Sequence, residues 1–196
     1  MKNTLAFLLT LIVCRSIAQP ATSDEYVQNF YTSCKPAKYS AFQDLQVGFQ
    51  LLDTKQYGRS IDRFARSLEK DSTCCDAFYM LAYCYQRQEQ LSQAFEYCER
   101  ALACDPQSAS AWIVKGTTFL MSGDSVASEG CFRNAIKFAP TKLDGYYGLA
   151  LSYYRQAKRK ECLDVILESE SAGAAAASPR DKKKMNKLKE LIQEGR

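Results

Sequence analysis

The chain has 196 residues, of which 46% are hydrophobic and 24% charged, a composition typical of a folded soluble protein rather than a disordered one. Its formal net charge of +4 is too small for the broad basic surface of a nucleic-acid-binding protein. The chain contains no histidine, which excludes Ser-His-Asp and Cys-His catalytic groups, and no G-x-x-x-x-G-K phosphate loop is present. We therefore expect neither catalytic residues nor a cofactor.

Residues 1–18 have the pattern of a secretory signal peptide. Lys2 precedes an apolar run from Leu5 to Cys14, and Ser16-Ile17-Ala18 follows at a plausible cleavage boundary. The apolar run is about half as long as the roughly twenty residues that a membrane-spanning helix needs. We expect cleavage after Ala18 and export to the periplasm or cell envelope, or secretion as the alternative. Lipidation of Cys14 is a second alternative.

Residues 19–40 form an N-terminal segment with one short predicted helix. Ser23 followed by Asp24 and Glu25 is a typical helix start, and Pro36 marks its end. One side of this helix is apolar, with Tyr26, Val27, Phe30 and Tyr31. We predict that the helix covers the apolar end of the structure that follows, with an interaction arm as the alternative.

From Ala41 to Leu167, apolar residues recur at the three- and four-residue spacing of amphipathic helices, without the alternation of strands. One pattern of small and large residues begins at Ala41, Cys75 and Ala109, 34 residues apart, and a weaker fourth copy begins at Leu143. A fixed period of this length indicates stacked helical units that bury their apolar faces against one another. We therefore predict an all-α fold.

Residues 75–108 carry the pattern most clearly, at Phe78, Leu81, Ala82, Tyr85, Ala94, Ala101 and Pro106. The stretch resembles the tetratricopeptide repeat, in which two antiparallel helices cross at small residues and a proline follows the second helix. The pattern recurs over 109–142, at Trp112, Gly116, Phe119, Ser128, Phe132, Ala135 and Pro140. The resemblance implies a right-handed solenoid of helical hairpins.

Two further segments match the repeat more weakly. Residues 41–74 have Asp44 where an aromatic residue is usual and Ser72 where proline is usual. Residues 143–171 keep the apolar pattern at Tyr146, Leu149, Ala150, Tyr153, Cys162 and Ile166. A linker of small residues over 172–178 then leads to a C-terminal capping helix over 179–196, whose apolar stripe is Met185, Leu188, Leu191 and Ile192. We expect about four repeats with a capping helix at each end.

The chain has nine cysteines, and in an exported protein these favour disulfides. No C-x-x-C pair is present, so the usual zinc-binding spacings are absent and no metal site is expected. Most of the repeat cysteines stand where the family places apolar or small residues, which favours burial. Cys75 begins the first helix of its repeat and Cys104 lies in the last turn of the second, so we predict a possible disulfide between them, with Cys74 as the competing partner of Cys104.

In the tetratricopeptide repeat family, the first helices of successive repeats line a concave groove that binds protein segments. The resemblance places these residues there: Leu45, Phe49, Leu52, Tyr79, Tyr83, Arg87, Ile113, Thr117, Leu120, Met121, Tyr147, Leu151, Tyr154 and Arg155. The set is mainly apolar and aromatic. Chaperone-associated members hold a C-terminal carboxylate with lysine and asparagine, whereas Leu45, Phe49 and Tyr79 stand at those positions here.

These observations predict an exported scaffold that binds an apolar or aromatic segment of a partner protein, with Arg87 and Arg155 contacting its acidic groups. The alternative is a structural subunit of an envelope assembly, which would use its convex faces and ends while its own N-terminal helix fills the groove. A redox role would need an accessible cysteine of low pKa, and no motif indicates one. The sequence makes no prediction of oligomeric state.

Overall fold

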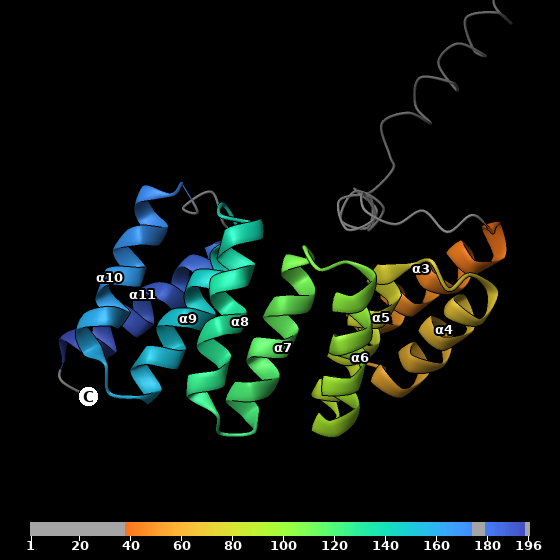
Figure 1. Ribbon diagram of the computed structural model, residues 1–196, viewed down its shortest axis with the longest axis horizontal. Coiled ribbons are helices and arrows are strands. Elements are labelled where there is room, and N and C mark those ends of the chain that lie inside the picture. The colour runs from red at the N-terminus through yellow and green to blue at the C-terminus, as the bar shows by residue number, and fades with distance from the viewer. Residues whose placement is uncertain (1–37, 174–178, 195–196) are drawn as a thin grey trace, which may run out of the picture. The chain divides into compact units, whose positions relative to one another are not determined.

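The computed structural model describes residues 38–173 and 179–194, and this part of the chain is helical without strands (Figure 1). In chain order the helices are α3 (Tyr39–Asp53), α4 (Tyr57–Lys70), α5 (Cys75–Arg87), α6 (Leu91–Cys104), α7 (Ala109–Met121), α8 (Ser125–Phe138), α9 (Leu143–Arg155), α10 (Arg159–Ser171) and α11 (Pro179–Gln193). The predicted all-α fold is confirmed. The predicted signal peptide, most of the N-terminal segment and residues 174–178 of the predicted linker lie outside the described residues.

The helices from α3 to α10 form four successive hairpins. Each hairpin packs its first helix against its second, and the second helix packs against the first helix of the next hairpin. Neighbouring first helices also touch, from α5 to α7 and from α7 to α9. This is the helical-hairpin solenoid that the repeat pattern predicts, and it leaves one side of each first helix to form a surface.

The turn inside each hairpin has one residue in the left-handed backbone region. These residues are Lys55, Glu89, Gly123 and Ala157, with φ of 57°, 61°, 89° and 59°. They occupy the same place in successive repeats, 34 residues apart. Only glycine adopts this conformation without a steric penalty, so three of the four turns use residues that tolerate it at some cost.

The two helices of a hairpin cross where a small residue of the first meets a large residue of the second. A Cβ added at Gly48 would lie 2.5 Å from Phe64 Cε1, and one added at Gly116 would lie 2.9 Å from Phe132 Cε1. Repeats two and four carry alanine at the first position, and the equivalent second positions hold the smaller Cys98 and Ile166. Glycine is therefore required where the ring is present.

Asp44 replaces the usual aromatic residue of repeat one with a buried carboxylate that pairs with two partly exposed cations. Its carboxylate accepts a hydrogen bond from Arg63 Nη1 at 2.9 Å and a second from Lys70 Nζ, while the Asp44 side chain is only 6% exposed. Burial by itself raises the pKa of Asp44, but the hydrogen bonds from Lys70 and Arg63 outweigh it and hold that pKa below its usual value. The carboxylate thus ties α3 to α4.

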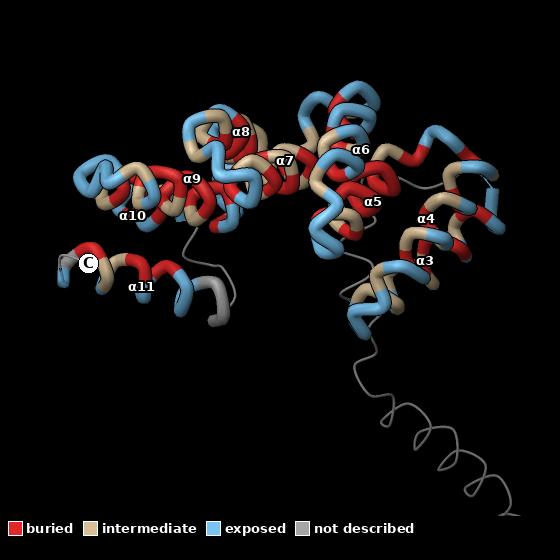
Figure 2. Tube along the Cα trace, turned by 90° about the horizontal axis from the view of Figure 1, so that it is seen from below, coloured by how far each residue is buried: buried red, intermediate tan, exposed pale blue. Residues whose placement is uncertain are grey.

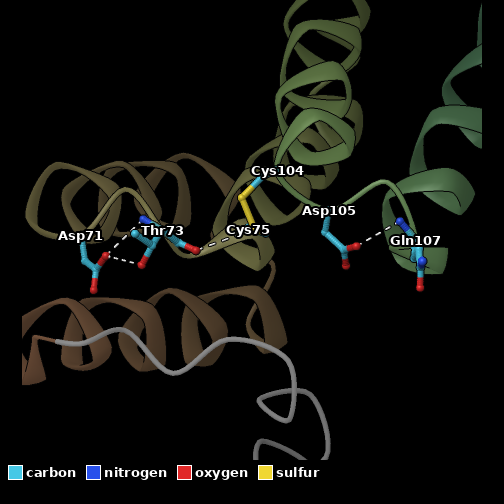
Figure 3. Close-up of a disulfide and its surroundings, with 6 residues drawn as sticks. All are labelled: Asp71, Thr73, Cys75, Cys104, Asp105 and Gln107. Carbon is cyan, nitrogen blue, oxygen red and sulfur yellow. Dashed lines mark hydrogen bonds between the residues drawn. A yellow bond between two sulfur atoms is a disulfide. The ribbon is translucent and has the colours of Figure 1, made fainter.

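A disulfide closes repeat two, joining Cys75 at the start of α5 to Cys104 at the end of α6 across a Cα–Cα distance of 5.5 Å (Figure 3). Cys74, the competing partner in the sequence hypothesis, is fully buried beside it. An aspartate turn stands in the loop at each side of the repeat: Asp71 Oδ1 accepts from Thr73 N at 3.1 Å, and Asp105 Oδ1 accepts from Gln107 N at 3.0 Å. Both turns shape the connection to the neighbouring repeat.

The C-terminal helix α11 packs on repeat four, against both α9 and α10. Its buried residues Met185, Leu188 and Ile192 are 4–5% exposed and share one apolar core with residues of α9 and α10. In Figure 2, α9 lies between α8 and α11. Three of the four predicted stripe residues are therefore buried, and Leu191 is half-buried. No helix among the described residues is both long and apolar enough to span a membrane.

Candidate functional site

The candidate site is the first-helix surface, defined as the outward side of α3, α5, α7 and α9 where the sequence places the groove residues. Three of those residues lie in the interior instead of on a surface. Leu45, Tyr79 and Leu120 are 0%, 5% and 4% exposed. α3, α5 and α7 each pack against the second helix of their own hairpin, and α5 and α7 also touch the first helix of the next repeat. These three residues support the packing of the helices and do not contact solvent.

On repeats one and two, the other four predicted residues remain partly or fully accessible. Phe49, Leu52 and Tyr83 are half-buried, and Arg87 is exposed. The ring of Phe49 meets the ring of Phe64 edge to face, with centroids 5.3 Å apart, which fixes the orientation of Phe49. α3 and α5 thus each present partly exposed aromatic or apolar side chains.

Arg87 adds a positive charge to the first-helix surface. Its Nε donates to the Tyr57 hydroxyl at 3.3 Å, and its Cζ lies 5.6 Å from the centre of the Tyr57 ring. The hydrogen bond with Tyr57 outweighs the effect of burial and raises the pKa of Arg87, and the Tyr83 hydroxyl acts in the same direction. The guanidinium is therefore charged at every physiological pH and oriented by aromatic neighbours.

On repeat four, α11 packs against α9 and contacts part of the predicted surface. Ile113, Tyr147, Leu151 and Tyr154 are half-buried and pack against the core that contains the apolar stripe of α11. Lys184 of α11 places its Nζ 5.9 Å from the centre of the Tyr147 ring. Sequence reasoning predicted that α11 would dock on repeat four, but its amphipathic pattern does not indicate which face of that repeat it covers.

Two predicted residues lie at the ends of these helices. Met121 is 46% exposed at the end of α7. Arg155, at the end of α9, is exposed and donates from Nη1 to the backbone carbonyl of Leu120 at 2.5 Å. Arg155 therefore satisfies a carbonyl in the last turn of α7, a structural contact that competes with contacts to a partner.

Gln86 of α5 forms hydrogen bonds to α7 that the sequence pattern did not indicate. It is 6% exposed, and its Nε2 lies 3.0 Å from Val114 O, 2.7 Å from Thr117 Oγ1 and 2.8 Å from Thr118 Oγ1. The amide joins α5 to α7 and also engages Thr117, a predicted groove residue. The sequence around Gln86 carries no signal that its hydrogen-bond partners lie in the next repeat.

Four buried thiols are largely protonated at neutral pH. Burial raises the pKa of Cys84 and Cys98 to about 12, and that of Cys131 and Cys162 to about 11. The thiolate is the nucleophilic and metal-binding form, so these residues act as small apolar side chains. Within residues 38–173 and 179–194, no three cysteine, aspartate or glutamate side chains gather into a group that could hold a metal ion.

Sequence comparison finds the same repeat. The family model described as tetratricopeptide repeat matches residues 75–108. A TPR repeat-containing protein of Methanocaldococcus jannaschii is 24% identical over 133 residues, covering 66% of this chain and 23% of that protein. A cell division cycle protein 27 homolog of Caenorhabditis elegans is 28% identical over 100 residues, covering 51% of this chain and 12% of that protein. The chain thus spans less than a quarter of the length of these curated relatives.

Solved structures share the fold. A thermophilic TPR protein of Thermus thermophilus superposes with a TM-score of 0.68 at 16% identity, covering 80% of this chain and 84% of that protein. MamA superposes with a TM-score of 0.62 at 18% identity, covering 69% of this chain and 80% of that protein. The family model thus matches one repeat, residues 75–108, and these structures share the helical-hairpin fold of the array.

Proposed function

We propose that this protein is a scaffold that binds an apolar or aromatic segment of a partner protein on the first-helix surface of repeats one and two. The observation that carries the proposal is the accessible set of Phe49, Leu52 and Tyr83 beside the oriented guanidinium of Arg87. Half-exposed aromatic side chains held by their neighbours make good contact residues because little side-chain entropy is lost on binding. Arg87 suits an acidic group next to the apolar segment.

Solved relatives of the same fold support a peptide as the ligand class. The first TPR of Spaghetti (RPAP3) was solved bound to an HSP90 peptide, SRMEEVD, and superposes on 60% of this chain with a TM-score of 0.57 at 15% identity. In the present chain, Leu45 and Tyr79 are buried apolar residues where chaperone-associated members are expected to have polar ones. We therefore propose an internal apolar segment as the ligand and not a free C-terminal carboxylate.

An array of synthetic peptides with varied apolar, aromatic and acidic residues tests the proposal. Wild-type protein is expected to select peptides with aromatic or large aliphatic residues, and amidation of the peptide C-terminus should not weaken binding. Tyr83→Ala is expected to weaken the best peptide by roughly thirty-fold, as expected for loss of an interface anchor. Tyr39→Ala is the matched control, because Tyr39 is 73% exposed at the start of α3.

Thermal melting separates a contact residue from a core residue in the same experiment. Tyr83→Ala should melt close to wild type, whereas Tyr154→Ala should melt earlier because Tyr154 packs against the C-terminal core. Equal peptide binding by wild type, Tyr83→Ala and Tyr39→Ala would contradict the proposed surface.

We also propose that the protein is exported and that Ala18 precedes the mature N-terminus. The support is the sequence pattern from Lys2 to Ala18. Intact mass measurement of the protein made in its own cell type is expected to give a chain that begins at Gln19. A mass that retains residues 1–18, or that fits a lipidated Cys14, would contradict this cleavage.

In the alternative function, a structural subunit of an envelope assembly, the N-terminal helix fills the surface. The residues of that helix lie outside the described part of the chain, so the alternative stays a prediction. It requires that removing the helix increases peptide binding, whereas the binding proposal above requires no such change.

A further inference from the structure

The first-helix surface of repeat four is covered by a helix of the same chain, and the contacts of that helix show what this surface accepts. Met185, Leu188 and Ile192 of α11 are spaced by three and four residues and are 4–5% exposed. The other described positions of α11 are mostly exposed: Lys182, Lys183, Lys184, Asn186, Lys187 and Glu190. The surface thus holds an amphipathic helix by one apolar stripe.

Tyr147, which the repeat register assigns to partner binding, lies against α11. Tyr147, Leu151 and Tyr154 pack against the core that contains the α11 stripe, and the Lys184 ammonium lies over the Tyr147 ring. Figure 2 shows α11 beside α9, with its buried residues drawn as separate red segments between exposed ones. α11 therefore occupies the place that a partner helix would take on repeat four.

The polar contacts of α11 with the array include an exposed ion pair. Lys189 Nζ lies 3.1 Å from Glu170 Oε1, and the two side chains are 33% and 54% exposed, so water and salt weaken this pair. The apolar stripe supplies the main attraction. A short covalent connection through residues 172–178 holds α11 at a local concentration of about a millimolar or more, which favours it over any helix that is free in solution.

We propose that α11 is an exchangeable internal ligand: when it leaves, the first-helix surface of repeat four binds an external amphipathic helix with an apolar stripe at the same spacing and lysines beside it. This inference rests on the proposed function and deepens it, because it adds the first-helix surface of repeat four as a second binding region that α11 regulates. In the resting chain α11 contacts the surface of repeat four, and displacement of α11 extends the binding surface to that repeat.

A labelled synthetic peptide of residues 179–196 tests the proposal on full-length protein. Leu188→Ser in the protein weakens the internal stripe, and this variant is expected to bind the peptide about tenfold or more tightly than wild type does. Lys187→Ser is the matched control, because Lys187 is an exposed neighbour on the same helix, and it should bind as weakly as wild type. A peptide that itself carries Leu188→Ser should not bind.

Equal weak binding by all three proteins, with the Leu188→Ser protein still helical by circular dichroism, would overturn the proposal. If that variant does not fold, hydrogen exchange in wild-type protein decides. Millimolar peptide should accelerate exchange in the protein's own residues 179–193 and leave α3 to α6 unchanged, and the absence of any acceleration would overturn the proposal. A concentration-dependent dimer in which two copies exchange α11, together with no binding of the peptide, would also overturn the proposal.

The two proposals fail separately. Tyr83 lies on α5, in a different repeat from α9, so Tyr83→Ala should weaken the partner peptide of repeats one and two and leave binding of the 179–196 peptide to the Leu188→Ser protein unchanged. Loss of both activities in a Tyr83→Ala, Leu188→Ser double variant that melts like the Leu188→Ser protein would contradict the assignment of two separate surfaces.

Discussion

At the scale of single residues, the turn inside each hairpin shows how backbone geometry constrains this fold. Gly123 has a φ of 89°, and a Cβ added to it would meet no atom within 4 Å. A side chain at this position is therefore opposed by the backbone conformation alone. Lys55, Glu89 and Ala157 adopt the same left-handed backbone region although they carry side chains. The array therefore tolerates the steric penalty at three of its four turns.

We predict that Gly123→Ala destabilises the protein by about 1 kcal/mol, because alanine disfavours the left-handed region. Gly130→Ala is the matched control. Gly130 lies inside α8 with open space around it, so the same chemical change should stabilise the protein by about 0.5–1 kcal/mol. Urea denaturation of both variants measures this, and two shifts of the same sign would contradict the assigned turn conformation.

The ion pair of Asp44 makes a second prediction for single residues. Because its pKa is lowered in the folded state, the ionised carboxylate stabilises the protein above the pKa of the unfolded chain, which is about 4, and this stabilisation is lost as pH falls through the lower folded pKa. Asp44→Asn is expected to cost about 1–3 kcal/mol at neutral pH.

The cost of Asp44→Asn should shrink below about pH 4, because the wild-type carboxyl then also becomes neutral. Denaturation curves between pH 7 and pH 2 measure the difference. Asp62→Asn, which removes an exposed carboxylate from α4, is the control and should change little at any pH. A cost of Asp44→Asn that is constant with pH would contradict the role of the charge.

At the scale of helices, the match between a glycine and an aromatic ring determines how closely two helices approach. Phe132 is enclosed by two glycines: a Cβ at Gly116 would lie 2.9 Å from its ring, and a Cβ at Gly148 would come closer still. Gly148 belongs to the next repeat, so one ring sets both the crossing within repeat three and the contact between repeats three and four. Gly48 and Phe64 form a simpler pair in repeat one.

We predict that Gly48→Ala costs about 1–3 kcal/mol, because the new methyl group would lie 2.5–2.9 Å from three atoms of the Phe64 ring. Combining it with Phe64→Ile reproduces the alanine and isoleucine of repeat four, at Ala150 and Ile166. The double variant should therefore be at least about 1 kcal/mol more stable than the sum of the single changes predicts.

Gly58→Ala is the control for Gly48→Ala. A Cβ at Gly58 would lie 3.5 Å from Gln88 Nε2, an ordinary contact distance, so this change should not destabilise the protein. Thermal or urea unfolding of wild type, Gly48→Ala, Phe64→Ile and the double variant gives the interaction energy between the two positions. Additive effects of Gly48→Ala and Phe64→Ile would mean that these two positions do not set the crossing.

At the scale of the whole described array, stability depends on contacts between neighbouring repeats, as in other linear repeat proteins. The junction of repeats two and three is partly polar. Lys115 is 16% exposed and lies 2.6 Å from Glu99 across the junction, and Gln86 joins α5 to α7 through its buried amide. These contacts couple the two halves of the array.

We predict that Gln86→Ala costs about 2–3 kcal/mol, at about 1 kcal/mol for each hydrogen bond lost, and makes unfolding less cooperative. The two halves should then unfold at different denaturant concentrations, with a lower apparent m-value. Gln93→Ala, at an exposed position of α6, is the control and should stay within about 0.5 kcal/mol of wild type. A single sharp transition for Gln86→Ala with an unchanged midpoint would contradict the coupling.

The sequence by itself determined the helical hairpins, because the spacing of small and large residues within each 34-residue period is a local property that specifies which helix faces pack together. The meeting of Cys75 with Cys104 follows from the same local pairing of antiparallel helices. Even the capping stripe of α11 is readable from the chain, since Met185, Leu188 and Ile192 recur at helical spacing.

Only the tertiary structure decided which apolar residues of the first helices form a surface. Leu45 and Phe49 lie on one helix, yet the first is buried and the second is half-exposed, because exposure depends on the neighbouring helices and not on periodicity. The partners of Asp44 lie 19 and 26 residues away in α4, and the helix that covers Tyr147 comes from the end of the chain. Contacts between distant segments carry no local signal, so they are settled only when the helices pack.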